Sequence, residues 1–329
     1  MFFLSGIVKQ QQHRLDKKDV EIIRKLAKDC RASYRSIAFA LGVTTTTIKL
    51  RVQKLIANNI IEKFVANVNP TLFDDEIISC IVIVRCRDPN DIARQLNLLG
   101  DLSVQVDCLG GVSVFHMIMR DEKKKKKIVD SLARSLKNAQ IRNVFINKLV
   151  PSHTALNDTD LRIMKCLIRE PRIKISDIAK TISLSERTIQ RRLDRMKTCH
   201  LLDFTLVPNS AAIRGYIYFG MVISLDKNRY QHIIEYVYSE LEEFFLRPPP
   251  VTRQEVIILN LYSDNFFDIE AILRKVESLE GVKMVEVFHA IRIRYCQTWL
   301  IREIDKRVAG KPIATNVISS KFKVIKKLD

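Results

Sequence analysis

Apolar residues near the start of the chain recur every three or four positions, which is the spacing of helices that bury one side. Short polar stretches interrupt this pattern twice, so it predicts three successive helices. The positions expected to face the core are Val20, Ile22, Ile23 and Leu26 in the first helix, Ile37, Ala38 and Leu41 in the second, and Ile48, Val52, Leu55 and Ile56 in the third.

The segment between the second and third helices has the residues of a tight turn. Gly42 can adopt the positive φ that such a turn needs. Thr44 stands at the expected N-cap, where its hydroxyl can accept a hydrogen bond from a backbone amide that lacks a partner inside the helix. The segment therefore predicts a helix-turn-helix motif, and the β-rich stretch IIEKFVANV that begins at Ile60 suits a wing.

Beyond this wing the apolar residues follow the period of two that is typical of strands. IISCIVIVRC indicates a strand, and Asp88-Pro89 indicates a helix start. VQVDCL and VSVFHMIM flank Gly110-Gly111 as a hairpin, and a second helix and the strand IRNVFINKLV follow. The order βαββαβ predicts a ferredoxin-like domain, whose open apolar sheet face we expect to be covered by another copy.

The second half of the chain repeats the first. A shift of 141 positions superposes about fifty residues without a gap, and it places Ser185 at the N-cap that corresponds to Thr44. We therefore expect a second wing in LLDFTLV, from Leu201, and a last strand in VKMVEVFHAIRIRY, from Val282.

The duplication sets the fold class. It is α+β, with two winged helix-turn-helix domains that are each followed by a ferredoxin-like βαββαβ domain. The expected winged helix-turn-helix domains are residues 1–70 and 151–214, the ferredoxin-like domains are residues 71–150 and 215–295, and a basic C-terminal tail covers residues 296–329.

The polar side of each third helix points away from its predicted core. Small polar and basic residues in the first two turns of such a helix suit insertion into the major groove of DNA. Any amphipathic surface helix also has a polar outer side, but a turn at the same offset in both copies favours the DNA-binding interpretation. The outward residues are Thr45, Thr46, Lys49 and Gln53 in the first copy, and Glu186, Arg187, Gln190 and Arg191 in the second.

The charge distribution supports a polyanionic partner. The chain has 55 Lys and Arg against 37 Asp and Glu, a net charge of +18. The net charge is +8 over residues 1–70 and +5 over residues 151–214. Double-stranded DNA is therefore the first expected partner and an anionic membrane the second. Because no run of 18 apolar residues occurs, we expect no membrane insertion.

Residues that could carry other chemistry are sparse. Seven cysteines are scattered without any CxxC pair, which indicates free thiols in a reducing cytoplasm. No phosphate-binding loop, dinucleotide fingerprint or nucleophile motif occurs, and Cys199-His200 has no second pair at metal spacing. We therefore expect no enzyme, no catalytic residue, no cofactor and no metal. The run Lys123–Lys127 spreads around a helix and indicates a solvated helix start.

The sequence resembles the Lrp/AsnC, or feast/famine, transcription regulators in a tandem-duplicated, archaeal form. The resemblance rests on LDKKDVEIIRKL, on SIAFALGVTTTTIKLRVQKL with its counterpart SDIAKTISLSERTIQRRLDRM, and on the RAM-type βαββαβ domain with its hairpin CLGGVSV. It implies pairing through the α/β domains and an amino acid or other small-molecule effector. It also implies DNA contacts by Thr45, Thr46, Thr47, Lys49 and Arg51, and by Arg187, Thr188, Gln190, Arg191 and Arg192.

Two departures concern the effector. The family hairpin that binds it corresponds to Gly110 and Gly111, but the acidic or amide residue usual after the glycine is here Ser113. The second copy has Pro248-Pro249-Pro250 in the corresponding region. An alternative function is that of an enzyme similar to the siroheme decarboxylases, which share this architecture, although their histidine-asparagine-tyrosine signature is not evident in the sequence.

The fusion also predicts a quaternary arrangement. Unfused members of the family pair their sheets and so present two recognition helices with two-fold symmetry. Here both sheets belong to one polypeptide, joined through residues 151–155, so we expect the chain to form a pseudo-dimer with itself. Pairing of sheets between different chains would give larger assemblies.

Overall fold

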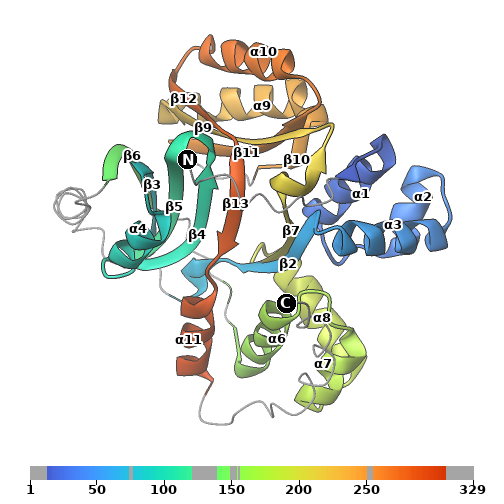
Figure 1. Cartoon of the computed structure of the whole chain (residues 1–329). Coiled ribbons are helices and arrows are strands. Elements are labelled where there is room, and N and C mark those ends of the chain that lie inside the picture. The colour runs from blue at the N-terminus through green and yellow to red at the C-terminus, as the bar shows by residue number, and fades with distance from the viewer. Residues whose placement is uncertain are drawn as a thin grey trace, which may run out of the picture.

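Two three-helix modules and two helix-covered sheets make up the computed structural model (Figure 1). It describes residues 13–73, 77–120, 139–148, 154, 156–249 and 255–308. The first module contains α1 (Lys17–Lys28), α2 (Tyr34–Leu41) and α3 (Thr45–Ala57), and the second contains α6 (Asp158–Arg169), α7 (Ile175–Ile182) and α8 (Glu186–Thr198).

The cores of the two modules follow the apolar pattern of the sequence. Ile22, Leu26 and Ile48 are fully buried in the first module, and Ile163, Leu167 and Ile189 correspond to them in the second. The prediction for Ile56 is wrong, because its side chain is 45% exposed near the end of α3. No helix among the described residues is long and apolar enough to cross a bilayer.

The strand after each module does not form a wing of its own module. β2 (Ile61–Val68) pairs antiparallel with β7 (Leu202–Pro208), with Val65 opposite Thr205, and the two make a separate two-stranded sheet. β7 is almost completely buried and half of the residues of β2 are buried, so neither strand is a free hairpin edge. The wing hairpins that we expected inside each module are therefore replaced by one ribbon that joins the modules. β1 (His13–Arg14) and β8 (Ile213–Arg214) form a second, short pair of parallel strands, in which β1 precedes the first module and β8 follows the ribbon strand β7.

The two larger sheets contain the ferredoxin-like elements. Their inner faces pack against each other through one apolar cluster that includes Ile81 and Ile83 of the first sheet and Val222 and Val256 of the second. The first half contributes β3 (Ile77–Cys86), α4 (Pro89–Leu96), β4 (Asp101–Cys108), β5 (Val112–Arg120) and β6 (Ala139–Lys148). The second contributes β9 (Ile217–Leu225), α9 (Tyr230–Glu240), β10 (Phe245–Arg247), β11 (Val256–Ser263), α10 (Phe266–Glu277) and β12 (Val282–Phe288).

The open apolar face expected for each sheet is thus covered by the other half of the same chain, while the helices lie outside (Figure 1). The expected second helix of the first domain, around residues 128–136, and the run Lys123–Lys127 lie outside the described residues.

The end of the second half departs from the prediction in its last strand. VKMVEVFHAIRIRY is divided at His289, and its second part, β13 (Ala290–Tyr295), leaves the second sheet. β13 pairs antiparallel with β4, which gives the sheet orders β13-β4-β5-β3-β6 and β10-β11-β9-β12. Residues Ala290 and Ile293 are buried against Val65 and Val207 of the ribbon. The edge of the first sheet is therefore supplied by the second half of the chain.

Part of the expected basic tail is a packed helix. α11 (Thr298–Arg307) buries Trp299, Leu300 and Ile304 in the same apolar cluster as the second module. Trp299 meets Phe73 edge-on, with ring centroids 6.2 Å apart. The segment that we expected to be a basic tail, residues 296–329, thus contains a packed helix, because the i, i+1 and i+5 apolar positions of α11 form a buried stripe once α6 lies beside it (Figure 1).

Candidate nucleic-acid interface

The third helix of the first module begins as the turn sequence predicts. Gly42 has φ +62, and the Thr44 hydroxyl accepts a hydrogen bond from the Thr47 amide at 3.1 Å. The Thr44 and Thr47 hydroxyls also lie 2.8 Å apart, so the Thr47 hydroxyl is hydrogen-bonded to the N-cap residue, and the side chain is only half-exposed. The side chains left on the outer face of α3 are those of Thr45, Thr46, Lys49 and Gln53, which are all exposed.

The second module repeats this geometry with different side chains. The Ser185 hydroxyl accepts from the Thr188 amide at 3.2 Å, so Thr188 occupies the position of Thr47. Arg187, Gln190 and Arg191 are exposed on the outer face of α8. The Gln190 amide donates to Asp194 Oδ1 at 2.8 Å, which holds it along the helix. Both third helices thus present polar first turns that can donate to and accept from base edges.

Two arginines that we expected to contact DNA are bound inside their own modules. Arg51 Nη1 lies 2.8 Å from Asp16 Oδ2 and 2.7 Å from Asp19 Oδ1, the two residues that cap α1. Arg192 Nη1 lies 2.9 Å from Asp160 Oδ1 and donates to Asn157 Oδ1 at 3.2 Å, in the same arrangement at the start of α6. These hydrogen bonds and charges raise the pKa of Arg51. Both arginines therefore tie the recognition helix to the first helix of the module.

Sequence reasoning missed two apolar side chains beside the polar face of the first module. Leu50 on α3 is 60% exposed and Phe39 on α2 is 92% exposed. The corresponding positions of the second module, 141 residues later, are the exposed Arg191 and Lys180. The comparison of the two copies would have shown this difference, because a position that changes from apolar to basic between repeats is unlike a core position. An apolar side chain in the major groove can contact the methyl group of thymine.

A reciprocal contact holds the modules to each other. Arg31 Nη1 donates to the carbonyl oxygens of Pro171 and Ile173, at 2.7 and 2.9 Å, and its guanidinium stacks on Phe204. Arg172, the counterpart of Arg31 in the repeat, donates to the carbonyl oxygen of Cys30 and stacks on Phe64. Each module thus inserts the same arginine into the other, as in a two-fold symmetric dimer.

The three residues expected to bind an effector are not brought together. Gly110 and Gly111 have φ values of +79 and +74 and line a surface pocket with Arg85, Arg87 and Asp88. Ser113 is fully buried, lies 4.0 Å from Cys86 Sγ through its Oγ, and does not line this pocket. Ser113 therefore does not join the two glycines at this pocket, and its part in effector binding stays a prediction.

The described residues contain no group of three or more His, Cys, Asp or Glu side chains that could hold a metal ion. All seven cysteines are free. Burial raises the pKa of the Cys30, Cys80 and Cys108 thiols to about 12, which keeps them protonated at neutral pH. These thiols are therefore apolar core residues and not nucleophiles.

Comparison with known proteins agrees with this geometry. The AsnC-type helix-turn-helix domain matches residues 15–56 and again residues 156–197. An HTH-type transcriptional regulator of Pyrococcus furiosus is 38% identical over 104 residues, which are 32% of this chain and 68% of that protein. Among solved structures, the siroheme decarboxylase NirDL is 12% identical, with a TM-score of 0.45 over 89% of this chain and 98% of its own. AsnC of E. coli is 17% identical, with a TM-score of 0.29, and the match covers 44% of this chain and 97% of AsnC. The chain belongs to the Lrp/AsnC family of DNA-binding transcription regulators and contains the AsnC-type helix-turn-helix domain twice.

Proposed function

We propose that a single chain reads two half-sites of a duplex operator, one with α3 and one with α8. The observation that carries this proposal is the pairing of β2 with β7, which joins the two modules within one polypeptide. The reciprocal contacts of Arg31 and Arg172 support it, because they give the modules a two-fold relation like that of a dimer. The half-site centres should then lie about one helical turn, or a multiple of it, apart on one face of the duplex.

The two half-sites should differ in sequence. Lys49 on α3 and Arg187 on α8 are exposed near the helix starts, where side chains reach base edges. Thr45, Thr46 and Gln190 would complete the base contacts. Because Arg51 and Arg192 already pair with acidic residues, we assign phosphate contacts to the exposed Arg191 in preference to them.

The experiment is a footprint combined with a solution mass. A labelled operator is titrated with the chain, and the mass of the complex is measured by light scattering. The proposal predicts that one chain protects two dissimilar half-sites. Two chains on one symmetric pair of half-sites would refute it.

Salt dependence tests the DNA-binding step itself. If about six phosphates are neutralised, affinity should fall on the order of a thousandfold between 50 and 200 mM salt. Arg191→Ala should reduce the slope of log affinity against log salt by about 1, and Leu50→Ala should leave the slope unchanged. Binding that is indifferent to salt would contradict phosphate recognition.

We also propose that the protein is not an enzyme and that it works in the cytoplasm, where its DNA and its reduced thiols would be found. One observation favours the alternative of a tetrapyrrole decarboxylase: His116, Asn260 and Tyr218 line the same internal cavity. The cavity volume of about 240 Å³ argues against it, because drug-sized ligands already need about 300–1,000 Å³ and a tetrapyrrole is larger than most of them. Purified protein should therefore show no haem-like absorption band, and such a band would favour the decarboxylase.

A further inference from the structure

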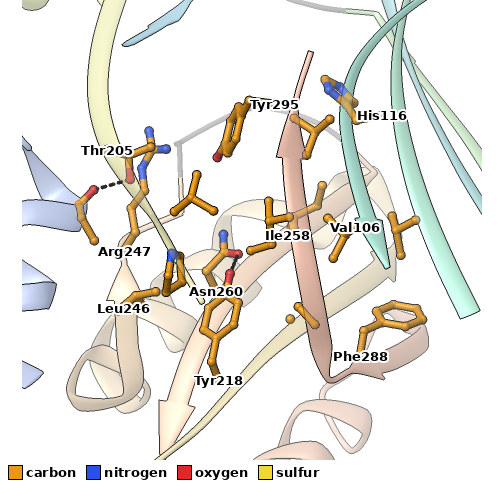
Figure 2. Close-up of a pocket in the computed structure, with 18 of the residues that line it drawn as sticks. Val106, His116, Thr205, Tyr218, Leu246, Arg247, Ile258, Asn260, Phe288 and Tyr295 are labelled. Carbon is orange, nitrogen blue, oxygen red and sulfur yellow. Dashed lines mark hydrogen bonds between the residues drawn. The ribbon is translucent and has the colours of Figure 1, made fainter. Parts of the chain in front are cut away.

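A cavity of about 240 Å³ lies between the two large sheets (Figure 2). Its walls come from β4 and β5 of the first sheet, from β9 and β11 of the second, from β13 and from the ribbon strand β7. Protein interiors pack as densely as organic crystals and leave few voids larger than a water molecule. This space equals the liquid volume of about eight water molecules, so it is far larger than a packing defect.

Most of the cavity wall is apolar. Val104 and Val106 line it on the first sheet, Ile258 on the second, and Val207 on the ribbon. Ile258 lines the cavity and is 40% exposed, although it belongs to a strand between β9 and β10. An apolar wall of this kind holds the hydrocarbon part of a ligand.

Polar groups gather on one part of the wall, where Figure 2 shows Tyr295, Arg247, Asn260 and Tyr218. The Tyr218 hydroxyl donates to Asn260 Oδ1 at 2.7 Å, which leaves the amide nitrogen of Asn260 as a donor. The Tyr295 hydroxyl makes no hydrogen bond within the described part of the chain, and burial raises its pKa. Arg247 pairs with Asp203, so its charge is balanced while it contributes further N–H groups.

Acceptors are scarce on the same wall. His116 lines the cavity, but its Nε2 lies 2.6 Å from the Ser79 hydroxyl and its Nδ1 2.5 Å from the Ser103 hydroxyl. Burial lowers the pKa of His116 to about 4, so the ring is neutral at physiological pH. Thr205 donates its hydroxyl to the carbonyl oxygen of Ala27 at 2.8 Å. A ligand cation placed here would lose its hydration without gaining charged partners.

We propose that this cavity binds an effector with a small branched or aromatic apolar body, a hydrogen-bond-accepting carboxylate or carbonyl head and no ammonium group. The body packs against Val106 and Ile258, and the head accepts from Tyr295 and Asn260. The inference rests on the proposed regulatory function, but it places the effector away from the Gly110-Gly111 hairpin. Because the proposed effector has no ammonium group, it does not belong to the amino acids.

The position of the cavity couples it to the DNA-binding modules. Thr205 and Val207 belong to β7, which pairs with β2 of the other module, and Ala27 belongs to α1. A ligand in the cavity therefore touches both sheets, the ribbon and the first module at once. Occupancy would alter how the ribbon sits between the sheets and so the relative placement of α3 and α8.

Calorimetric titration of the full chain with three probes of one carbon skeleton tests the ligand class. The probes are 4-methylpentanoate, 4-methyl-2-pentanone and leucine. We expect the carboxylate or the ketone to bind and leucine to bind at least tenfold more weakly. Equal binding of leucine, or binding of none of the three, would overturn the proposal.

Three variants test the place of binding. Tyr295→Phe removes one hydrogen-bond donor and should lower the affinity for the probe about tenfold. Tyr236→Phe makes the same change on α9, outside the cavity, and should leave affinity unchanged. Ile258→Trp adds volume to the exposed wall and should abolish probe binding. Unchanged affinity in both Tyr295→Phe and Ile258→Trp would place the ligand elsewhere and refute the site.

Operator binding by the same proteins separates the two proposals. Wild-type protein should bind operator DNA with an affinity that changes by at least threefold when the probe is added, whereas the operator affinity of Ile258→Trp, whatever its value without the probe, should not respond to the probe. Probe binding without any change in operator affinity would refute the coupling. Loss of operator binding by wild-type protein would instead refute the proposed function.

Discussion

The two helix-turn-helix modules have the same three helices, but different parts of the chain hold them in place. In the first, Arg24 donates to the carbonyl oxygens of Phe245 and Glu242, each at 2.9 Å, in the second ferredoxin-like half. Its counterpart in the repeat, Lys165, pairs with Asp305 of α11. The same face of the first helix thus meets a sheet edge in one module and an added helix in the other.

Their outer faces have also diverged. Exposed Phe39 and Leu50 in the first module correspond to exposed Lys180 and Arg191 in the second. The buried positions keep their apolar character, because a change of volume or polarity in a packed core destabilises the fold. Duplication therefore preserved the module as a folding unit and left its surfaces able to take different partners.

The largest expected effect on the free energy of unfolding tests whether α11 anchors the second module more strongly than Arg24 anchors the first. Trp299→Ala removes the main buried side chain of α11 and should lower the free energy of unfolding by about 3–5 kcal/mol. Arg24→Ala removes the side chain that anchors the first module, and it should cost about 1 kcal/mol because this side chain is partly exposed. Urea unfolding followed by circular dichroism measures both, since Trp299 is the single tryptophan and its fluorescence is lost in the variant. Equal losses would show that α11 does not anchor the second module.

The ion pairs that tie the recognition helix to the first helix, here called charge clamps, differ in burial. The Asp160 side chain is fully buried and pairs with Arg192 and Arg195, whereas the Asp19 side chain, which pairs with Arg51, is 8% exposed. Removing a buried partner leaves the other charge without compensation, although the arginines here are partly exposed. Asp160→Ala should therefore cost about 2–3 kcal/mol of unfolding free energy and Asp19→Ala about 1–2 kcal/mol.

Thermal unfolding of both variants, with the exposed Glu186→Ala as a control, measures the difference between the clamps. A larger loss for Asp19→Ala than for Asp160→Ala would contradict the order derived from burial.

Base recognition should differ between the modules. Lys49→Ala and Arg187→Ala should each cost about 1–3 kcal/mol of binding free energy at one half-site and relax its preferred sequence. The half-site affected should not be the same for the two variants, because the residues belong to different recognition helices. Competition with operators that carry one altered half-site measures this. A uniform loss at both half-sites would assign these side chains to phosphates.

The smallest effect concerns the turn before the recognition helix. Gly42 has φ +62, and no atom of the described residues lies within 4 Å of the position that a Cβ would take there, while Ser183 adopts φ +61 at the corresponding place. A side chain in this region is strained, so Ser183→Gly should stabilise the second module by up to about 1 kcal/mol. Gly42→Ala should destabilise the first by about 1 kcal/mol, which thermal unfolding can detect. A loss of stability in Ser183→Gly would refute this account of the turn.

The repeat and the helical modules could be predicted from the sequence because their information is local. Apolar spacing identified the buried side of α1 and α8, and Thr44 and Ser185 cap their helices as expected. The effector residues could not be found in this way. Arg247 and Asn260 are paired on neighbouring strands of the second sheet, but Tyr295 belongs to β13 in the first sheet, and only the packing of the two sheets brings it to the same cavity.

The sequence by itself determined the number of units, their secondary structure and the apolar faces that had to be covered. Tertiary structure decided which segments cover them. The ribbon of β2 and β7, the passage of β13 into the first sheet and the docking of α11 all depend on strand edges and apolar stripes that could pair with several partners. Local spacing shows that such an edge or stripe needs a partner, but the choice among partners follows from the shape of the whole packed chain.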